Sequence, residues 1–233
     1  MNLNTDPAEL AKFSALAHRW WDLTGEFRAL HDINPLRLDW MQAALGDLHG
    51  KRWLDVGCGG GLISEGMARR GAAVVGIDMA DKALAVAKLH ALDQGIAVDY
   101  RLSTAEALAV AEPASFDAVS CLEMLEHVPH PASVIAACAA AAKPGAPIFF
   151  STINRNPLAY ATAVVGAEYV LNLLPKGTHD YAKFITPAEL TRMARAAGLT
   201  VLDVRGMDYN PFSHRASWSP RPWVNYAVQC VKA

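Results

Sequence analysis

A cluster of four glycines within five positions, directly after a short apolar run, constrains the fold more than any other feature. Residues 54–61 read LDVGCGGG, and the apolar-periodic stretch after them predicts a helix up to Arg70. Glycines at a strand-to-helix junction let the backbone turn tightly and approach a ligand. The N–H groups that begin a helix also favour an anionic group. We therefore expect Gly57 and Gly59 to lie against a bound ligand.

Two residues beside this turn argue against a dinucleotide. The G-x-G-x-x-G pattern requires glycine at position 62, where the chain has Leu62. Asp55 precedes the turn, where its carboxylate would either order the loop or face a cationic aminoacyl group. A pyrophosphate gains nothing from that carboxylate. A turn that binds nothing is the remaining alternative.

The segments after Arg52 alternate between short apolar runs and helical stretches, which predicts a parallel sheet with helices on both faces. The expected strands are residues 53–56, 73–78, 98–102, 116–122 and 147–152. Two further strands, 199–204 and 223–231, follow without a helix long enough for a parallel crossover between them. We therefore expect an α/β fold with a seven-stranded, mostly parallel sheet and an antiparallel last strand.

We expect the 233 residues to form a single domain, because no repeat or Gly/Ser linker interrupts them. Helices are predicted from Pro7 to Trp21 and again from Asn34 onward. The resulting parts are an N-terminal helical cover (1–50), a ligand-binding core (51–153), a helical insertion between strands five and six (154–185) and a C-terminal helix with strands (186–233).

Composition and charge exclude several classes of protein. The net charge is −2 and no block of Lys or Arg stands out, which disfavours nucleic acid as a partner. The four cysteines are far apart, without a C-x-x-C pair, as is typical of a reducing compartment. Because the sequence has neither a signal peptide nor a run of ~20 apolar residues, we expect a cytoplasmic protein.

Polar residues follow the second and third predicted strands. Asp78 and Met79 end the second strand, where a carboxylate accepts hydrogen bonds from ribose hydroxyls. The alternative role for Asp78 is a cap of the next helix, and the two roles are compatible. Residues 103–106, with Thr104 and Ala105 at their centre, are placed to border an adenine ring, and the alternative for Glu106 is a capping box with Ser103.

The most concentrated polar group follows the fourth strand, where Leu122 is succeeded by Glu123, Glu126 and His127. These side chains are suited either to deprotonating an acidic hydroxyl or to holding a divalent cation that lowers its pKa. We take His127 and Glu126 as the catalytic candidates. A structural role is the alternative for the histidine.

Together these stretches resemble the ubiquinone-biosynthesis O-methyltransferase family, whose members methylate hydroxyls of polyprenylated phenols and catechols. The resemblance runs nearly end to end. Beyond the glycine turn it is carried by RWWD (19–22), INPLRL (33–38), EMLEHV (123–128), FSTINRN (150–156), VVGAEY (164–169) and PKGTHD (175–180). It implies a Rossmann-like class I methyltransferase fold with S-adenosylmethionine as methyl donor.

By the same resemblance, Arg37, Gly57, Asp78 and Leu122 match positions that contact S-adenosylmethionine. The planar guanidinium of Arg37 suits pairing with the methionine carboxylate. The alternative is that Arg37 is a surface arginine. Glu123, Glu126 and His127 match positions that some members are thought to use for Mg²⁺.

The resemblance also names partners: a polyprenylated phenol or catechol, and a ubiquinone-biosynthesis complex. The apolar stretch 158–174 is either a lid helix or a segment in the interface of an anionic membrane, which would make the protein peripheral. The rival functions are methylation of another small phenol or carbon acceptor, and a non-catalytic subunit that binds S-adenosylmethionine.

Overall fold

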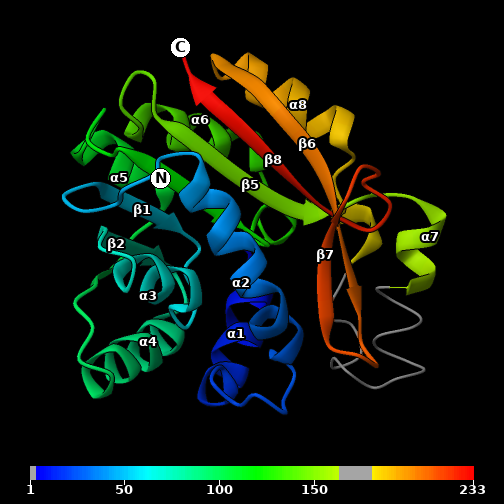
Figure 1. Cartoon of the computed structure of the whole chain (residues 1–233), viewed down its shortest axis with the longest axis horizontal. Coiled ribbons are helices and arrows are strands. Elements are labelled where there is room, and N and C mark those ends of the chain that lie inside the picture. Colours follow the sequence, from blue (N-terminus) through cyan, green and yellow to red (C-terminus); the bar gives the residue numbers. More distant parts are fainter. Residues whose placement is uncertain (1–3, 163–179) are drawn as a thin grey trace.

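The computed structural model describes residues 4–162 and 180–233 (Figure 1). Its helices and helical turns are α1 (Pro7–Leu16), η1 (Ala17–Arg19), α2 (Arg28–Ala43), α3 (Leu62–Ala68), α4 (Asp81–Asp93), α5 (Ala105–Ala111), η2 (Leu125–His127), α6 (Pro131–Ala141), α7 (Pro157–Ala159), η4 (Tyr181–Lys183) and α8 (Pro187–Ala196). Its strands are β1 (Arg52–Val56), β2 (Ala73–Asp78), β3 (Asp99–Leu102), β4 (Ala118–Leu122), β5 (Pro147–Ile153), β6 (Leu199–Asn210), β7 (Arg215–Ser219) and β8 (Asn225–Lys232).

The strands form one sheet in the order β3-β2-β1-β4-β5-β8-β6-β7. The first five pair in parallel, and β8 runs antiparallel to both β5 and β6. The expected antiparallel last strand is therefore confirmed. The direction of chain progression reverses between β1 and β4, and sheets of this type place ligands at the carboxyl ends of the strands beside such a reversal.

The expected count of seven strands is wrong, because the described residues form eight. β6 continues to Asn210 and pairs antiparallel with β7 in a hairpin. Residues 205–219 contain no apolar run, and the burial pattern of β7 has no buried position. A half-exposed hairpin of this kind is stabilised by packing against neighbouring segments more than by its own strand propensity. Its sequence therefore gives little strand signal.

The second helix also begins earlier than expected. α2 starts at Arg28, and Pro35 lies inside it instead of near its start. A proline in a helix interior costs about 3 kcal/mol. Burial of the apolar side chains of α2, Leu38 and Met41 among them, offsets that cost, and the Asn34 amide donates to the Leu62 carbonyl at 3.2 Å.

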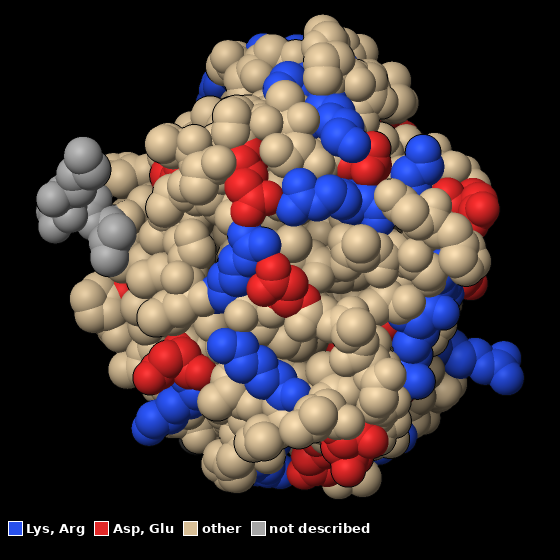
Figure 2. All heavy atoms as spheres, turned by 90° about the vertical axis from the view of Figure 1, so that its left-hand side faces the viewer, with Lys and Arg blue, Asp and Glu red and all other residues tan. Residues whose placement is uncertain are grey.

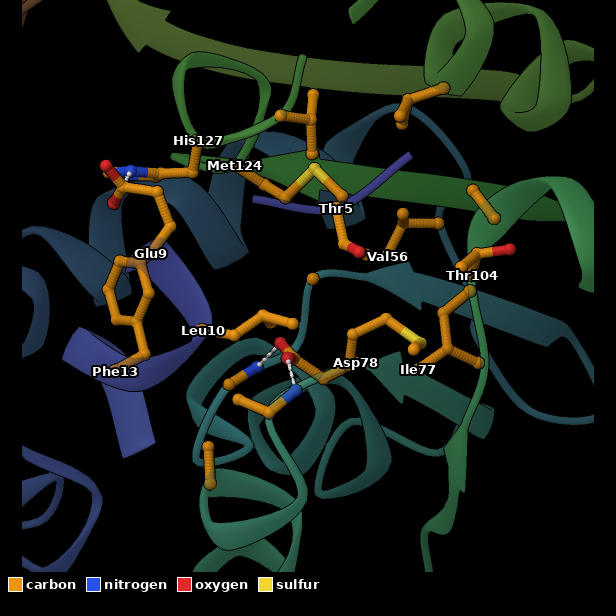
Figure 3. Close-up of a pocket in the computed structure, with 18 of the residues that line it drawn as sticks. Thr5, Glu9, Leu10, Phe13, Val56, Ile77, Asp78, Thr104, Met124 and His127 are labelled. Atoms are coloured by element: carbon orange, nitrogen blue, oxygen red, sulfur yellow. Dashed lines mark hydrogen bonds and ion pairs between the residues drawn. The ribbon is translucent and has the colours of Figure 1, made fainter. Parts of the chain in front are cut away.

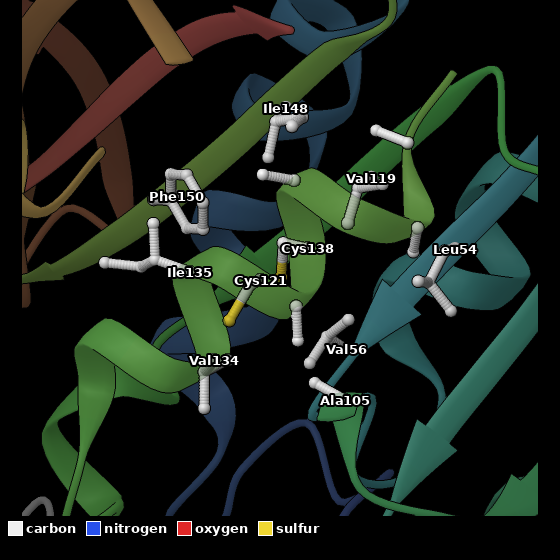
Figure 4. Close-up of a cluster of buried hydrophobic side chains, with 14 of the residues drawn as sticks. Leu54, Val56, Ala105, Val119, Cys121, Val134, Ile135, Cys138, Ile148 and Phe150 are labelled. Carbon is white, nitrogen blue, oxygen red and sulfur yellow. The ribbon is translucent and has the colours of Figure 1, made fainter. Parts of the chain in front are cut away.

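Apolar side chains cover both faces of the sheet. Figure 4 shows one face, where α6 packs on β4 and β5 with Ile135, Cys138 and Phe150 at the centre. On the other face α2 and α3 bury a second cluster around Trp53 and Phe149. With its faces filled, the sheet leaves its edge at the carboxyl ends of the strands for a ligand.

The surface shows no segregation of charge on the face in Figure 2, where Lys and Arg alternate with Asp and Glu. Such an arrangement produces no large field of one sign over that face. Within residues 4–162 and 180–233, no helix is both long and apolar enough to cross a membrane.

Candidate active site

One cavity lies at the carboxyl ends of β1, β2 and β4, covered by the N-terminal segment (Figure 3). It brings together eight of the residues expected from the sequence: Gly57, Gly59, Asp78, Met79, Thr104, Ala105, Glu123 and His127. Four others, Arg37, Asp55, Leu122 and Glu126, are buried behind its described walls. The cavity therefore joins the glycine turn to the polar group after β4.

The glycine turn needs glycine for both conformation and space. Gly57, Gly59 and Gly61 have φ values of 70°, 52° and 93°, a region that other residues rarely adopt. A Cβ on Gly57 would lie 2.4 Å from Met124 Cγ. A Cβ on Gly60 would lie 2.2 Å from Trp20 Cγ. The side chains packed on this turn therefore leave room for backbone alone.

Asp78 connects β2 to this turn. Its Oδ2 accepts from the Gly59 N–H at 2.8 Å, and its Oδ1 accepts from the Ala80 N–H at 2.8 Å. Burial raises the pKa of this carboxyl, although the hydrogen bonds lower it. The helix-capping role is thus present, while Asp78 still lines the cavity where a ribose would lie.

Asp55 orders the core beneath the turn. Its carboxylate accepts from the Ser64 hydroxyl at 2.7 Å and from the Ser120 hydroxyl at 2.8 Å. Trp53 Nε1 donates to the same Ser120 hydroxyl at 2.9 Å. Burial raises the Asp55 pKa to about 6. Of the two roles predicted for this carboxylate, its contacts match the ordering of the loop.

Arg37 is a buried cation with only long contacts. Its guanidinium lies 3.9 Å from Glu123 Oε1, 3.5 Å from Asn34 Oδ1 and 3.4 Å from the Leu30 carbonyl. Its Nε has no partner among the described residues. Burial lowers the Arg37 pKa, and the Glu123 carboxylate opposes that shift. A buried guanidinium with a free donor is suited to an additional anionic group.

Leu122, the last residue of β4, lies in the buried cluster around Trp53. Its side chain packs in the sheet core, and the described residues give it no position on the cavity wall. The pairing of β4 with β5 places it opposite Ser151.

The three side chains expected to hold Mg²⁺ have separate partners. Glu123 accepts from Ser151 at 2.6 Å, and Glu126 accepts from Thr152 at 2.7 Å. The residues described contain no group of three His, Cys, Asp or Glu side chains suited to a metal ion. The arrangement of these side chains in the described residues does not fit a Mg²⁺ site.

Glu126 itself is buried, 4% exposed. Burial raises the pKa of its carboxyl. Because this side chain lies behind the described cavity wall, its position does not match direct contact with a substrate.

His127 has a partner that the sequence did not indicate. Its Nδ1 lies 3.0 Å from Glu9 Oε2 on α1. The hydrogen bond from His127 lowers the Glu9 pKa to about 2, against the effect of burial. The His127 ring also meets the Phe13 ring edge to face, with centroids 4.9 Å apart. An N-terminal helix thus completes the group after β4.

The N-terminal segment supplies the cavity residues that sequence reasoning did not name. They are Asn4, Thr5, Asp6, Glu9, Leu10, Phe13 and Trp20. The sequence predicted a helical cover at 1–50. However, polar and apolar residues are not separated clearly enough on α1 to show which face of the helix lies against the cavity. Only the docked helix shows which residues line it.

Glu106 lines the cavity, and the capping box with Ser103 that was its alternative role is not formed. Thr104 is the helix cap, with its hydroxyl accepting from the Ala107 N–H at 3.2 Å. Glu106 Oε1 instead accepts from the Asn4 amide at 2.9 Å and from the Ser133 hydroxyl at 2.8 Å. It therefore anchors the N-terminal segment across the cavity.

Comparison with known proteins identifies the family. A family profile described as a methyltransferase domain matches residues 29–204. The ubiquinone biosynthesis O-methyltransferase of Azoarcus sp. is 61% identical over 232 residues, covering 100% of this chain and 99% of the relative. That of Ralstonia nicotianae is 61% identical over 225 residues, covering 97% and 94% of the two chains. The chain belongs to the ubiquinone biosynthesis O-methyltransferase family.

Solved structures agree with the fold. The magnesium protoporphyrin IX methyltransferase of Synechocystis with bound SAH has a TM-score of 0.71 at 20% identity, covering 98% of this chain and 100% of that one. A SAM-dependent methyltransferase of Thermotoga maritima has a TM-score of 0.67 at 18% identity, covering 97% and 99%. The class I methyltransferase fold expected for this O-methyltransferase family member is confirmed.

Proposed function

We propose that this O-methyltransferase moves the methyl group of S-adenosylmethionine to a phenolic oxygen of a polyprenylated ubiquinone precursor. The observation that carries the proposal is the single cavity shared by the glycine turn, Asp78 and His127. In Figure 3, Thr104 and Ile77 lie on one side of this cavity and His127 on the other. A donor bound by its adenosine near Thr104 would direct its sulfonium toward the side of His127.

The fit to S-adenosylmethionine rests on unused donors and on space. Asp78 suits the ribose, and Gly57 and Gly59 of the glycine turn line the same cavity. The buried Arg37 guanidinium, with its unpaired Nε, suits the methionine carboxylate once the side chains beside it rearrange. When bound, the donor supplies an electrophilic methyl group, and the chain supplies its alignment.

The acceptor oxygen must lose a proton on the way to reaction, because a free phenol has a pKa near ~10. His127 lies on the cavity wall and its Nε2 has no hydrogen bond within the described residues. We assign it the role of general base. Such a base contributes ~10²–10⁴-fold to a rate.

Donor binding and a comparison of two acceptors test this proposal. Calorimetry with S-adenosylmethionine and with NAD measures donor choice, and we expect binding of the first alone. Methyl transfer to a short-tailed polyprenyl catechol is then compared with transfer to catechol without a tail. The proposal predicts a higher kcat/KM for the tailed ring. Equal values for the two rings would assign the enzyme to small phenols.

Peripheral contact with an anionic membrane is the second part of the proposal. The hypothesis concerns residues 158–174, of which 163–174 lie outside the described residues. In the described part, Leu158 and Tyr160 are 47% and 46% exposed. Exposed apolar side chains of this kind suit an interface that retains a prenyl tail. Flotation with anionic vesicles tests it, and protein that stays at the bottom of the gradient would contradict it.

A further inference from the structure

Glu9 and His127 lie 118 positions apart in the chain, yet their side chains meet at the cavity wall (Figure 3). Both are largely enclosed, with side chains 11% and 15% exposed. The carboxylate comes from α1, and the imidazole comes from the helical turn after β4. Removing the N-terminal helix would therefore leave the histidine without its partner.

The contact determines which imidazole nitrogen carries a proton. An ionised carboxylate only accepts hydrogen bonds, so the Nδ1 atom of His127 must be the donor. In a neutral imidazole the lone pair then lies on Nε2. A carboxylate behind a histidine both fixes this tautomer and increases the basicity of the other nitrogen.

The orientation of the ring is fixed from a second direction. Phe13 lies one helical turn after Glu9, so both side chains extend from the same face of α1. Its ring meets the His127 ring at an interplanar angle of 87°. The carboxylate holds one edge of the imidazole while the phenyl ring packs against it, which leaves the ring little freedom to rotate.

The helix that carries both residues is anchored at several points. Asn4 donates to Glu106 and exchanges hydrogen bonds with the His130 backbone. Lys183 Nζ lies 2.9 Å from Asp6 Oδ2 and 3.3 Å from Glu9 Oε1. Lys183 thereby contacts one oxygen of Glu9, and His127 contacts the other.

We propose that Glu9 is a positioning residue that acts through His127 in methyl transfer. As the bond between the phenolic oxygen and the methyl carbon forms, the bond from that carbon to sulfur breaks. The phenolic proton moves to His127 Nε2, and Glu9 faces the resulting imidazolium. The products are the methyl ether and S-adenosylhomocysteine. This inference rests on the function proposed above.

A double-substitution cycle tests the inference. We expect Glu9→Ala to lower kcat about 10–100-fold, as for other partners that orient a functional histidine, with the KM for S-adenosylmethionine unchanged. Glu9→Gln keeps a polar group but no charge, and we expect an intermediate kcat. In a His127→Ala background, Glu9→Ala should cause no further loss. An equal fold-loss in both backgrounds would mean that Glu9 acts only on the structure, and would overturn the proposal.

Asp39→Asn is the matched control. It removes an exposed ion pair, Asp39 Oδ1 to Arg70 at 2.6 Å, on a helix side chain that does not line the cavity, so kcat should stay near the wild-type value. The cycle also separates two failures. A fully active His127→Ala protein would refute the general base and Glu9 together. An impaired His127→Ala protein beside a fully active Glu9→Ala protein would refute Glu9 alone.

Discussion

Asp78 Oδ2 accepts a hydrogen bond from the Gly59 N–H at 2.8 Å, so the end of β2 is tied directly to the glycine turn after β1. The two segments belong to neighbouring parallel strands, and the bond closes the gap between their carboxyl ends. A ligand that contacts the turn and the carboxylate together therefore meets a surface that is already assembled.

The first prediction concerns this link. Asp78→Asn replaces one acceptor oxygen with an NH₂ group, which would face one of the two N–H donors of Gly59 and Ala80. We expect the affinity for S-adenosylmethionine to fall at least about 10-fold, equivalent to about 1.4 kcal/mol. Calorimetry measures it, with the exposed Asp81→Asn as a control. Unchanged affinity would remove Asp78 from the donor site.

A second prediction separates strain from collision in the glycine turn. Gly57 and Gly145 have similar φ values, 70° and 76°, so alanine at either position costs roughly 1–2 kcal/mol of strain. A Cβ on Gly145 meets nothing within 4 Å, whereas one on Gly57 meets Met124. Both variants should lose stability in urea unfolding, but only Gly57→Ala should lose donor binding. Binding retained by Gly57→Ala would contradict the assignment.

A third prediction concerns the pH dependence of stability. Because the Asp55 pKa is raised to about 6 in the folded protein, the folded state holds this proton more tightly than the unfolded state does. Its contribution is therefore largest below its unfolded pKa of ~3.9 and is lost as pH rises to about 6, by about 3 kcal/mol. Asp55→Asn should flatten this fall in urea unfolding between pH 4 and pH 7. Parallel curves for the two proteins would contradict it.

The fourth prediction concerns metal removal. Glu123 and Glu126 are held by Ser151 and Thr152, and His127 is held by Glu9. With these side chains engaged separately, we expect methyl transfer to keep its rate after exhaustive dialysis against a chelator. A loss of activity that added Mg²⁺ restores would show that the three residues rearrange around a cation.

The sequence predicted the parts of the fold that depend on local pattern. The five parallel strands and the antiparallel final strand follow from the hydrophobic periodicity of the sequence. The glycine turn follows from the residue types that turns require. The hairpin of β6 and β7 did not, because its polar residues carry no such pattern. The predicted start of α2 beside Pro35 was wrong, because tertiary packing outweighed the preference of proline for the first turn of a helix.

The candidate site also contains residues that the sequence predicted and residues that it did not. Gly57, Asp78 and His127 stand at strand ends, where topology alone brings them to one edge of the sheet. Glu9 and Phe13 reach that edge only because α1 docks across it, and a single sequence contains no signal for such a contact. The Mg²⁺ hypothesis rested on closeness in sequence, which alone does not make side chains converge on a cation, and it stays a prediction.

The central claim is methyl transfer to a ring oxygen of a prenylated acceptor. The most direct measurement uses S-adenosylmethionine with an isotope-labelled methyl group, a short-tailed polyprenyl catechol and NMR of the isolated product. The account predicts the label in a methoxy group on the ring. Label on a ring carbon, or no transfer by protein that binds the donor, would contradict it.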